Sequence, residues 1–247
     1  MEVSSRRVVP ELLDELAPDD PRAKRSRRDL RMIHRFMRSA SILKRLIGNL
    51  RLAAPPRRLI ELGAGDGTLM LAVARSLAPR WSGVELTLLD RVDLVTDDTC
   101  DAYRLLGWEV RRVRMDIANW ARIDAGTPYD LCLASLFLHH FEGAQLASLM
   151  KGIARRADAF IASEPRRDAL ARIAARSVVL IGANAVTRGD AVKSVDAGFS
   201  GKELEAAWGG AGEDWILGEF RAPPFTHCFT AVRRGCTVAT DTHATHR

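Results

Sequence analysis

From residue 58 to residue 232, short apolar runs alternate with longer segments in which apolar residues recur every three or four positions. The short runs predict strands buried on both faces of a sheet, and the periodic segments predict amphipathic helices. The predicted strands lie near residues 58–62, 84–89, 109–114, 130–135, 158–163, 214–219 and 225–232. The predicted helices lie near residues 67–78, 92–106, 141–155, 168–183 and 201–208. This alternation predicts an α/β domain with an open, mostly parallel seven-stranded sheet and helices on both faces.

The two ends of the chain differ from this middle part. Between residues 22 and 58, Met, Ile, Leu and Phe recur at helical spacing among many arginines and lysines, which predicts basic amphipathic helices packed on another element. Pro55-Pro56 ends these helices, and Pro223-Pro224 marks a turn between the last two strands. We therefore expect a helical cap over residues 1–54, one domain over residues 55–234 and a disordered tail over residues 235–247.

The most informative segment is a glycine-rich turn that connects the first predicted strand to the first helix after it. Gly63, Gly65 and Gly67 follow the apolar strand and precede a helical pattern. Glycines at these positions let the backbone turn tightly and approach a ligand closely. A dinucleotide-binding turn requires a third glycine where this chain has Thr68, so the pattern disfavours NAD.

With Glu61 before the first glycine, this segment resembles motif I of the class I S-adenosylmethionine-dependent methyltransferases, an acidic residue followed by G-x-G-x-G. The resemblance implies a sheet that ends in a C-terminal antiparallel hairpin, with S-adenosyl-L-methionine as the cofactor. It assigns cofactor binding in this turn to Glu61, Gly63, Ala64, Gly65 and Gly67. The methionine and ribose that such a turn wraps carry no phosphate. That agrees with the nearby acids Glu61 and Asp66, whose charges would repel a phosphate.

Acidic residues also follow the second and third predicted strands. Asp90 ends the second strand 27 residues after Gly63, where a carboxylate can accept both hydroxyls of a ribose. Its alternative role is to cap the next helix, whose pattern begins at Val92. In the resemblance, Asp90 is motif II and Arg91 flanks the adenine. Asp116 and Ile117, after the third strand, would bind the adenine amino group and cover the ring.

The fourth predicted strand ends in Ser135 and Leu136 and continues into His139-His140, at the edge where an open sheet binds its ligand. The resemblance places Ser135 and Leu136 beside the cofactor, and the L-x-L-H-H-F run is similar to small-molecule methyltransferases of the quinone and polyketide type. The N-P-P-Y, D-P-P-Y and Pro-Cys motifs of nucleobase methylation are absent from the sequence. Ser135 also stands where the catechol-type metal arrangement requires an acid, so no metal is expected.

A phenol or enol acceptor needs a base that titrates near neutrality. His139 and His140 are the candidates, and adjacent residues at a helix start point about 100° apart, so one of them is expected to face the acceptor. Either could instead cap the following helix. His227 is a third, weaker candidate for the base. Glu164, after the fifth strand, either touches the substrate or holds its own loop.

Composition narrows the remaining classes of function. Four cysteines lack metal-binding or paired spacing and indicate reduced thiols in a cytosolic protein. The first residues have no apolar signal core, and no run approaches the roughly 20 apolar residues of a membrane span. We therefore expect a cytoplasmic protein without a membrane span. The net charge of +6 comes largely from the basic N-terminal segment, which can hold phosphates or form the solvated face of helices.

The resemblance implies a methyltransferase of secondary metabolism that acts on a small-molecule acceptor, through O-methylation or, next, C-methylation of a phenolic, quinone or polyketide-like compound. A nucleic-acid partner is not expected, because Phe36 is nearly alone among the basic residues as an aromatic stacking platform. Two alternatives stay open. One is an RNA or protein methyltransferase that docks through the basic cap, and the other is a non-catalytic cofactor-binding module. Neither the acceptor atom nor the oligomeric state follows from the sequence.

Overall fold

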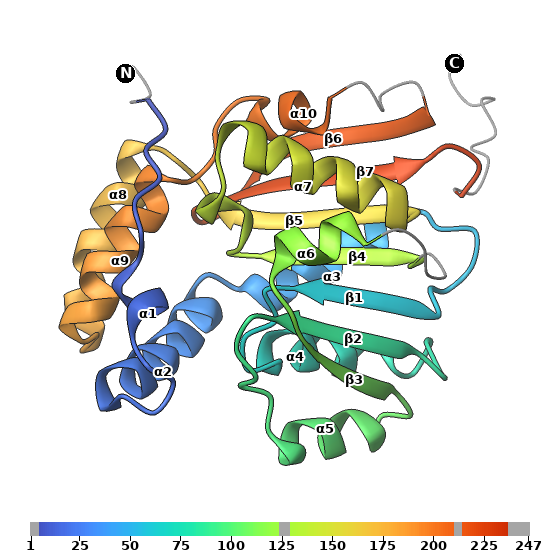
Figure 1. The fold of residues 1–247 in the computed structure, drawn as a ribbon, viewed down its shortest axis with the longest axis horizontal. Coiled ribbons are helices and arrows are strands. Elements are labelled where there is room, and N and C mark those ends of the chain that lie inside the picture. The colour runs from blue at the N-terminus through green and yellow to red at the C-terminus, as the bar shows by residue number, and fades with distance from the viewer. Residues whose placement is uncertain (1–4, 124–128, 210–213, 237–247) are drawn as a thin grey trace, which may run out of the picture.

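The computed structural model describes residues 5–123, 129–209 and 214–236. Its centre is a seven-stranded sheet in the order β3-β2-β1-β4-β5-β7-β6 (Figure 1). The strands are β1 Arg58–Leu62, β2 Glu85–Asp90, β3 Glu109–Arg114, β4 Leu131–Ser135, β5 Ala159–Pro165, β6 Trp215–Ala222 and β7 Thr226–Arg233. β1 to β5 are parallel, and β7 runs antiparallel to both β5 and β6. All seven predicted strands and the predicted C-terminal hairpin are confirmed.

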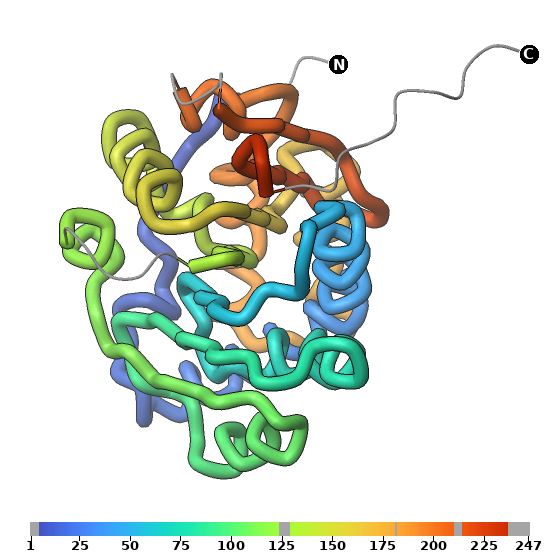
Figure 2. Tube along the Cα trace, turned by 90° about the vertical axis from the view of Figure 1, so that its right-hand side faces the viewer, coloured from blue at the N-terminus to red at the C-terminus, as the bar shows by residue number. Residues whose placement is uncertain are grey.

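Helices cover both faces of this sheet. The helices are α1 Leu12–Glu15, α2 Pro21–Phe36, α3 Ser39–Asn49, α4 Thr68–Leu77, α5 Asp97–Arg104, α6 Ile117–Arg122, α7 Gly143–Arg156, α8 Ala169–Arg176, α9 Ala185–Asp196 and α10 Glu203–Trp208, with 3₁₀ turns η1 Leu138–His140 and η2 Ser177–Ile181. Buried side chains of α3, α4 and α5 share one apolar cluster with the sheet, and those of α6, α7 and α10 share another. Figure 2 shows the blue α3 and the yellow-green α7 on opposite sides. Among the described residues, no helix is long and apolar enough to cross a membrane.

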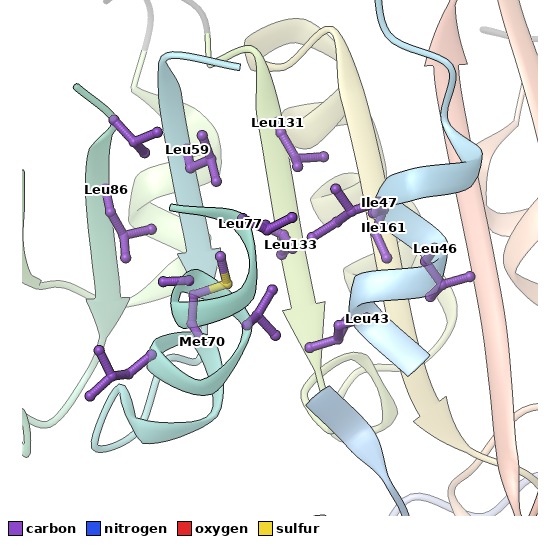
Figure 3. Packing of buried hydrophobic residues seen from close by; sticks show 14 of the residues in the cluster. Leu43, Leu46, Ile47, Leu59, Met70, Leu77, Leu86, Leu131, Leu133 and Ile161 are labelled. Carbon is purple, nitrogen blue, oxygen red and sulfur yellow. The ribbon is translucent and has the colours of Figure 1, made fainter. Parts of the chain in front are cut away.

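Alternation along the strands builds the two clusters. On β1, Leu59 points to the α3 and α4 side while Ile60 points to the opposite side, as the period of two requires. Figure 3 shows Leu43, Leu46 and Ile47 of α3 near Leu133 of β4 and Ile161 of β5. The helix α3 lies within the segment expected to form the cap, and its apolar stripe packs in the core of the sheet.

A layer of helices stands at the carboxyl ends of the parallel strands. Figure 1 shows α1, α2, α8 and α9 stacked there, and α9 contacts the other three. Asp29 of α2 is buried and accepts hydrogen bonds from the backbone N–H of Asn184 (2.8 Å) and the hydroxyl of Thr187 (3.1 Å). Asn184 is the N-cap of α9, so one buried carboxylate joins the basic helix to the start of its neighbour.

Three helical features differ from the prediction or were missed. α5 begins at Asp97 and not near residue 92, because Thr96 caps it by accepting from the Thr99 N–H. α6 has six residues, too few to show a period. α9 was missed because its neighbours α1, α2 and α8 cover several of its sides, so it lacks a single apolar stripe. Most of the predicted C-terminal tail, residues 237–247, lies outside the described residues.

Candidate functional site

The glycine-rich turn occupies the carboxyl end of β1, where the sheet order reverses between β1 and β4. Gly63, Gly65 and Gly67 have φ angles of 67°, 55° and 71°, a region that side chains disfavour. The backbone N–H groups of Gly63 and Ala64 donate to the carbonyl of Leu89 at 2.9 and 3.1 Å, so the turn is tied to β2. No described atom lies within 4 Å of a Cβ built on Gly65. The turn therefore leaves open space beside Gly65 for a ligand.

Asp90 faces this turn from the end of β2. One carboxylate oxygen accepts from the backbone N–H of Gly65 at 2.9 Å, and the other accepts from that of Val92 at 3.0 Å. The alternative role of Asp90 as a helix cap is wrong, because α5 starts seven residues later with Thr96 as its cap. The structure thus brings Asp90 and Gly65 together, as their spacing in the sequence predicted.

Two buried oxygens at this edge have no partner among the described residues. They are Oε2 of Glu61 on β1 and Oγ of Ser135 at the end of β4. Burial, with added repulsion from the charges of Asp66 and Asp90, raises the pKa of Glu61 to about 8. Buried polar atoms are rarely left without a hydrogen bond, so both atoms indicate a missing polar ligand. The residues present therefore fit a bound group with hydrogen-bond donors.

Three further predicted cofactor contacts are Arg91, Asp116 and Ile117. Arg91 reaches the cap, where its guanidinium donates to the carbonyl of Asp14 at 2.6 Å and lies 3.1 Å from its carboxylate. Asp116 is the exposed N-cap of α6 and accepts from Ala118 at 2.8 Å. Ile117, next to it, is buried. Their predicted contacts with adenine stay predictions.

The turn after β4 has a strained backbone and places Phe137 over the glycine-rich turn. Leu136 has a φ of 50°, unusual for a residue with a branched side chain. Its N–H donates to the carbonyl of Ser163 on β5 at 2.9 Å. The next side chain, Phe137, lies over Gly63, where an added Cβ would sit 2.2 Å from the ring. Phe137 is a site residue that the sequence analysis missed, because nothing in its local pattern separates it from a core aromatic.

Glu164, at the end of β5, stabilises this turn through hydrogen bonds to its side-chain carboxylate. Its side chain is fully buried. One oxygen accepts from the N–H groups of Phe137 (3.0 Å) and Leu138 (2.9 Å), and the other from the N–H of His139 (3.3 Å). The second oxygen also contacts Nδ1 of His139 at 2.9 Å. Of the two roles considered for Glu164, the structure shows the loop-holding one.

His139 lies between two carboxylates. Nδ1 contacts Glu164, and Nε2 lies 3.4 Å from Oε1 of Glu11, which comes from the segment before α1. Burial alone would lower the pKa of His139, but hydrogen bonding to the two acids and their charge outweigh burial and raise the pKa to about 9. His139 is therefore an imidazolium at neutral pH, with both ring nitrogens engaged.

His140 has a different environment. Its side chain is 28% exposed, and Nδ1 lies 3.4 Å from Oδ2 of Asp14 in α1. Burial and the charge of His139 lower the pKa of His140, against the opposing charges of Glu11, Asp14 and Glu164. Its Nε2 takes part in no hydrogen bond or ion pair within the described ranges 5–123, 129–209 and 214–236. His140 is therefore neutral at pH 7 and has a free ring nitrogen.

His227, the weaker candidate, is buried on β7. Its Nε2 contacts Oε1 of Glu219 at 2.6 Å, and its ring stacks on Phe199 with centroids 6.4 Å apart. Only 1% of the side chain is exposed, which leaves no approach for an acceptor. Glu11 and Asp14, by contrast, reach the histidine pair although no motif marked them. They lie more than 120 residues away in the sequence, so only the fold brings them there.

Comparison with known proteins bears on the fold. No family model and no curated protein matches the sequence. Among solved structures, the plantazolicin methyltransferase BpumL in complex with SAH aligns with a TM-score of 0.64 and 16% identity, over 87% of this chain and 92% of that one. The fold is that of the class I methyltransferases. The predicted fold class is thus confirmed.

Two further solved structures with a similar fold are longer than this chain. An O-methyltransferase family protein from Burkholderia thailandensis aligns with a TM-score of 0.58 and 19% identity, over 87% of this chain and 60% of that one. The pyocyanin biosynthetic protein PhzM aligns with a TM-score of 0.57 and 18% identity, over 91% and 62%. At these identities the likeness concerns the fold, and the chemistry must be argued from the residues of this chain.

Proposed function

We propose that this chain is an S-adenosyl-L-methionine-dependent methyltransferase that acts on the hydroxyl group of a neutral small molecule such as a phenol or enol. The observation that carries the proposal is the pairing, at one sheet edge, of a ligand-ready glycine turn with a neutral histidine. Glu61 and Ser135 present partnerless buried oxygens at the ends of β1 and β4. The chain that leaves β4 then delivers His140 with a free ring nitrogen.

Residues in and around the glycine-rich turn would each bind a different part of the cofactor. Asp90 suits the ribose hydroxyls, because its carboxylate already faces Gly65. Glu61 suits the ammonium group of the methionine end, since a nearby positive charge would favour its ionised form. Asp116 and Ile117 remain the proposed adenine contacts, and Gly65 leaves the backbone open to close approach. When bound, the cofactor would supply a methyl group on a sulfonium sulfur, and a neutral thioether would remain after transfer of that methyl to the acceptor oxygen.

The histidine pair indicates the catalytic base and the class of acceptor. The acceptor hydroxyl would give its proton to Nε2 of His140, and such general-base catalysis contributes roughly a hundred- to ten-thousand-fold. His139 is unsuited to this step, because its ring nitrogens face Glu164 and Glu11. The imidazolium of His139 is already paired with Glu164 and Glu11, and the guanidinium of Arg91 with Asp14, so neither cation is left over to bind an anionic acceptor such as a carboxylate. A neutral hydroxyl therefore fits best.

Cofactor and acceptor are tested in turn. S-adenosylhomocysteine should raise the melting temperature, by an amount equivalent to about 2.7 kcal/mol at a hundredfold excess over Kd, while NAD should not. Methylation of neutral phenols, aryl carboxylates and amines should then be compared by mass spectrometry. Stabilisation by NAD alone would refute the methyltransferase proposal, and preferential methylation of amines or carboxylates would refute the acceptor class.

One observation favours a second candidate, an RNA or protein methyltransferase. Several basic side chains of α2 point to solvent, including Arg25, Arg28 and Arg35. If they bind nucleic acid, affinity must fall steeply with salt concentration. Retention of labelled RNA that weakens linearly with the logarithm of salt would favour this candidate, and its absence at low salt would leave the small acceptor.

A further inference from the structure

We propose that Asp14 is a positioning residue for His140, and that residues 6–14, here called the N-terminal strap, form part of the catalytic site. This inference rests on the proposed function, since it concerns the base of that reaction. The strap crosses the carboxyl edge of the sheet between the helix α9 and the turn η1, at the left in Figure 1.

Arg6 anchors the strap at its start. Its guanidinium donates to the carbonyls of Ala197 (2.8 Å), Phe141 (2.8 Å) and His139 (3.2 Å). The same group lies over the ring of Phe199, 4.3 Å from its centroid. Three carbonyl acceptors and one aromatic face leave this side chain little freedom, so the strap is tied directly to the residues that flank the histidine pair.

Asp190 of α9 anchors the other end. Its two carboxylate oxygens accept from the N–H groups of Leu12 and Leu13, each at 2.9 Å. These are the free donors of the first turn of α1, and a carboxylate is their favoured partner. Ser194 of α9 also hydrogen-bonds to the Glu11 side chain. These anchors do not involve the Asp14 carboxylate, so that group can be altered without releasing the strap.

Arg91 fixes Asp14 itself. Its guanidinium donates to the Asp14 carbonyl at 2.6 Å and lies 3.1 Å from Oδ1, which leaves Oδ2 facing Nδ1 of His140 at 3.4 Å. A carboxylate at Nδ1 favours the tautomer with its proton on that nitrogen, so that Nε2 carries the lone pair that accepts a proton. Asp14 therefore orients the base and selects its reactive form.

The charges that face His140 set the direction of the pH effect. They are His139 in the same turn, Glu11 and Asp14 in the strap and α1, and Glu164 on β5. His139 disfavours protonation of His140, while the three acids favour it. Loss of the Asp14 charge would thus move the acidic limb of the activity profile to lower pH while activity at the plateau falls. The fall in kcat at the plateau, where His140 is neutral in every variant, is the readout that the charge of Asp14 alone would not produce.

The same groups allow one competing arrangement. A carboxylate oxygen of Glu11 and a ring nitrogen from each of His139 and His140 lie within 4.8 Å of one another, a spacing that a divalent cation could bridge. Metal ligation would use the lone pair of His140 that the base requires. The two arrangements therefore predict opposite responses to chelation, and only one of them can describe the site.

The test compares Asp14→Asn, Asp14→Glu, His140→Gln and the control Glu15→Gln in the full-length protein, with the phenol that wild type methylates. Glu15 is the exposed neighbour of Asp14, so the control makes the same change of charge on the same helix. We expect Asp14→Asn to lower kcat about ten- to hundredfold, less than the ~10⁴ of a buried triad, because 45% of the Asp14 side chain is exposed. Asp14→Glu should recover part of the loss, and Glu15→Gln should match wild type.

Three outcomes distinguish the positioning role of Asp14, metal ligation at the histidine pair, and failure of the proposed function. Equal kcat and equal pH profiles for Asp14→Asn and Glu15→Gln would overturn the positioning role while leaving the proposed function intact. Activity that is abolished by EDTA and restored by Zn²⁺ or Mn²⁺ would also overturn it, in favour of metal ligation. Wild type that neither binds S-adenosylhomocysteine nor methylates any acceptor would instead end the proposed function, and with it the inference.

Discussion

Glu61 and Glu164 are two buried glutamates at the carboxyl edge of the same sheet, and they satisfy burial in opposite ways. Glu164 has three backbone N–H donors and the imidazole of His139 around its carboxylate. Glu61 has an oxygen without any partner among the described residues, and burial raises its pKa to about 8. A buried carboxylate must be fully hydrogen-bonded or become neutral.

This difference indicates that Glu164 has a structural role in the site, whereas Glu61 has an oxygen available to bind a ligand. Glu164 binds only groups of this chain, so its work is complete before any substrate arrives. Glu61 has an oxygen with no partner among the described residues, and its pKa leaves it protonated at neutral pH. Unsatisfied burial costs stability, and it persists in proteins mainly where function uses it.

The largest expected effect comes from removing the carboxylate that is fully hydrogen-bonded. Glu164→Ala leaves three N–H groups and the charged His139 without their buried partner, which should cost about 3–5 kcal/mol of unfolding free energy. Glu61→Gln should cost less than about 1 kcal/mol at pH 7, because the native side chain is already neutral there. Urea unfolding followed by circular dichroism measures both. Similar losses for the two variants would break the comparison.

The second prediction concerns stability against pH. The pKa of Glu61 is about 8 in the folded protein and near its ordinary 4.5 when unfolded, so the folded state holds a proton that the unfolded chain releases. This contribution is complete below pH 4.5 and is lost as the pH rises to about 8, by up to about 1.4 kcal/mol per pH unit. His139, with a pKa of about 9, loses its own contribution between pH 6.5 and 9.

Glu61→Gln isolates the first of these terms, since the variant keeps His139. Both proteins are unfolded by urea at pH 5 and at pH 8. The unfolding free energy of wild type, relative to that of the variant, should be higher at pH 5 than at pH 8. Parallel stability curves for the two proteins would mean that Glu61 is ionised in the folded state, and the contrast with Glu164 would disappear.

The third prediction tests the partner of the glycine turn. Asp90→Ala removes charge-assisted hydrogen bonds of about 1.5–3 kcal/mol from the ligand, so the Kd of S-adenosylhomocysteine should rise roughly ten- to hundredfold. Isothermal titration calorimetry gives the Kd, and the matched control is Asp93→Ala, which removes an exposed acid from the same connection. An unchanged Kd in the folded variant would limit Asp90 to holding Gly65.

The same contrast explains what the sequence could predict. Glu61, Gly65 and Asp90 belong to neighbouring strands whose ends meet by the rule of parallel sheets, so spacing along the chain sufficed. Glu11 and Asp14 reach His139 and His140 only because Arg6 and Asp190 fasten the strap across the sheet edge. Such contacts depend on tertiary packing between segments that carry no periodic or local signal. The two histidines could be named from sequence, but the difference between their protonation states could not.

The smallest expected effect is a proton released when the ligand binds. If the ammonium group of the ligand approaches Glu61, the ionised carboxylate is favoured, and a side chain with a pKa of about 8 gives up its proton near pH 7. Titrations of S-adenosylhomocysteine in two buffers of different ionisation enthalpy should show the release of up to about one proton, with affinity that rises less than tenfold per pH unit between pH 6 and 8. The amino group of the ligand also titrates, so Glu61→Gln supplies the baseline to subtract. Glu164→Gln does not serve here, because that carboxylate has no vacancy for the ligand and its loss disturbs the fold. Proton release that is equal in wild type and Glu61→Gln would show that the ammonium group of the ligand does not bind at Glu61.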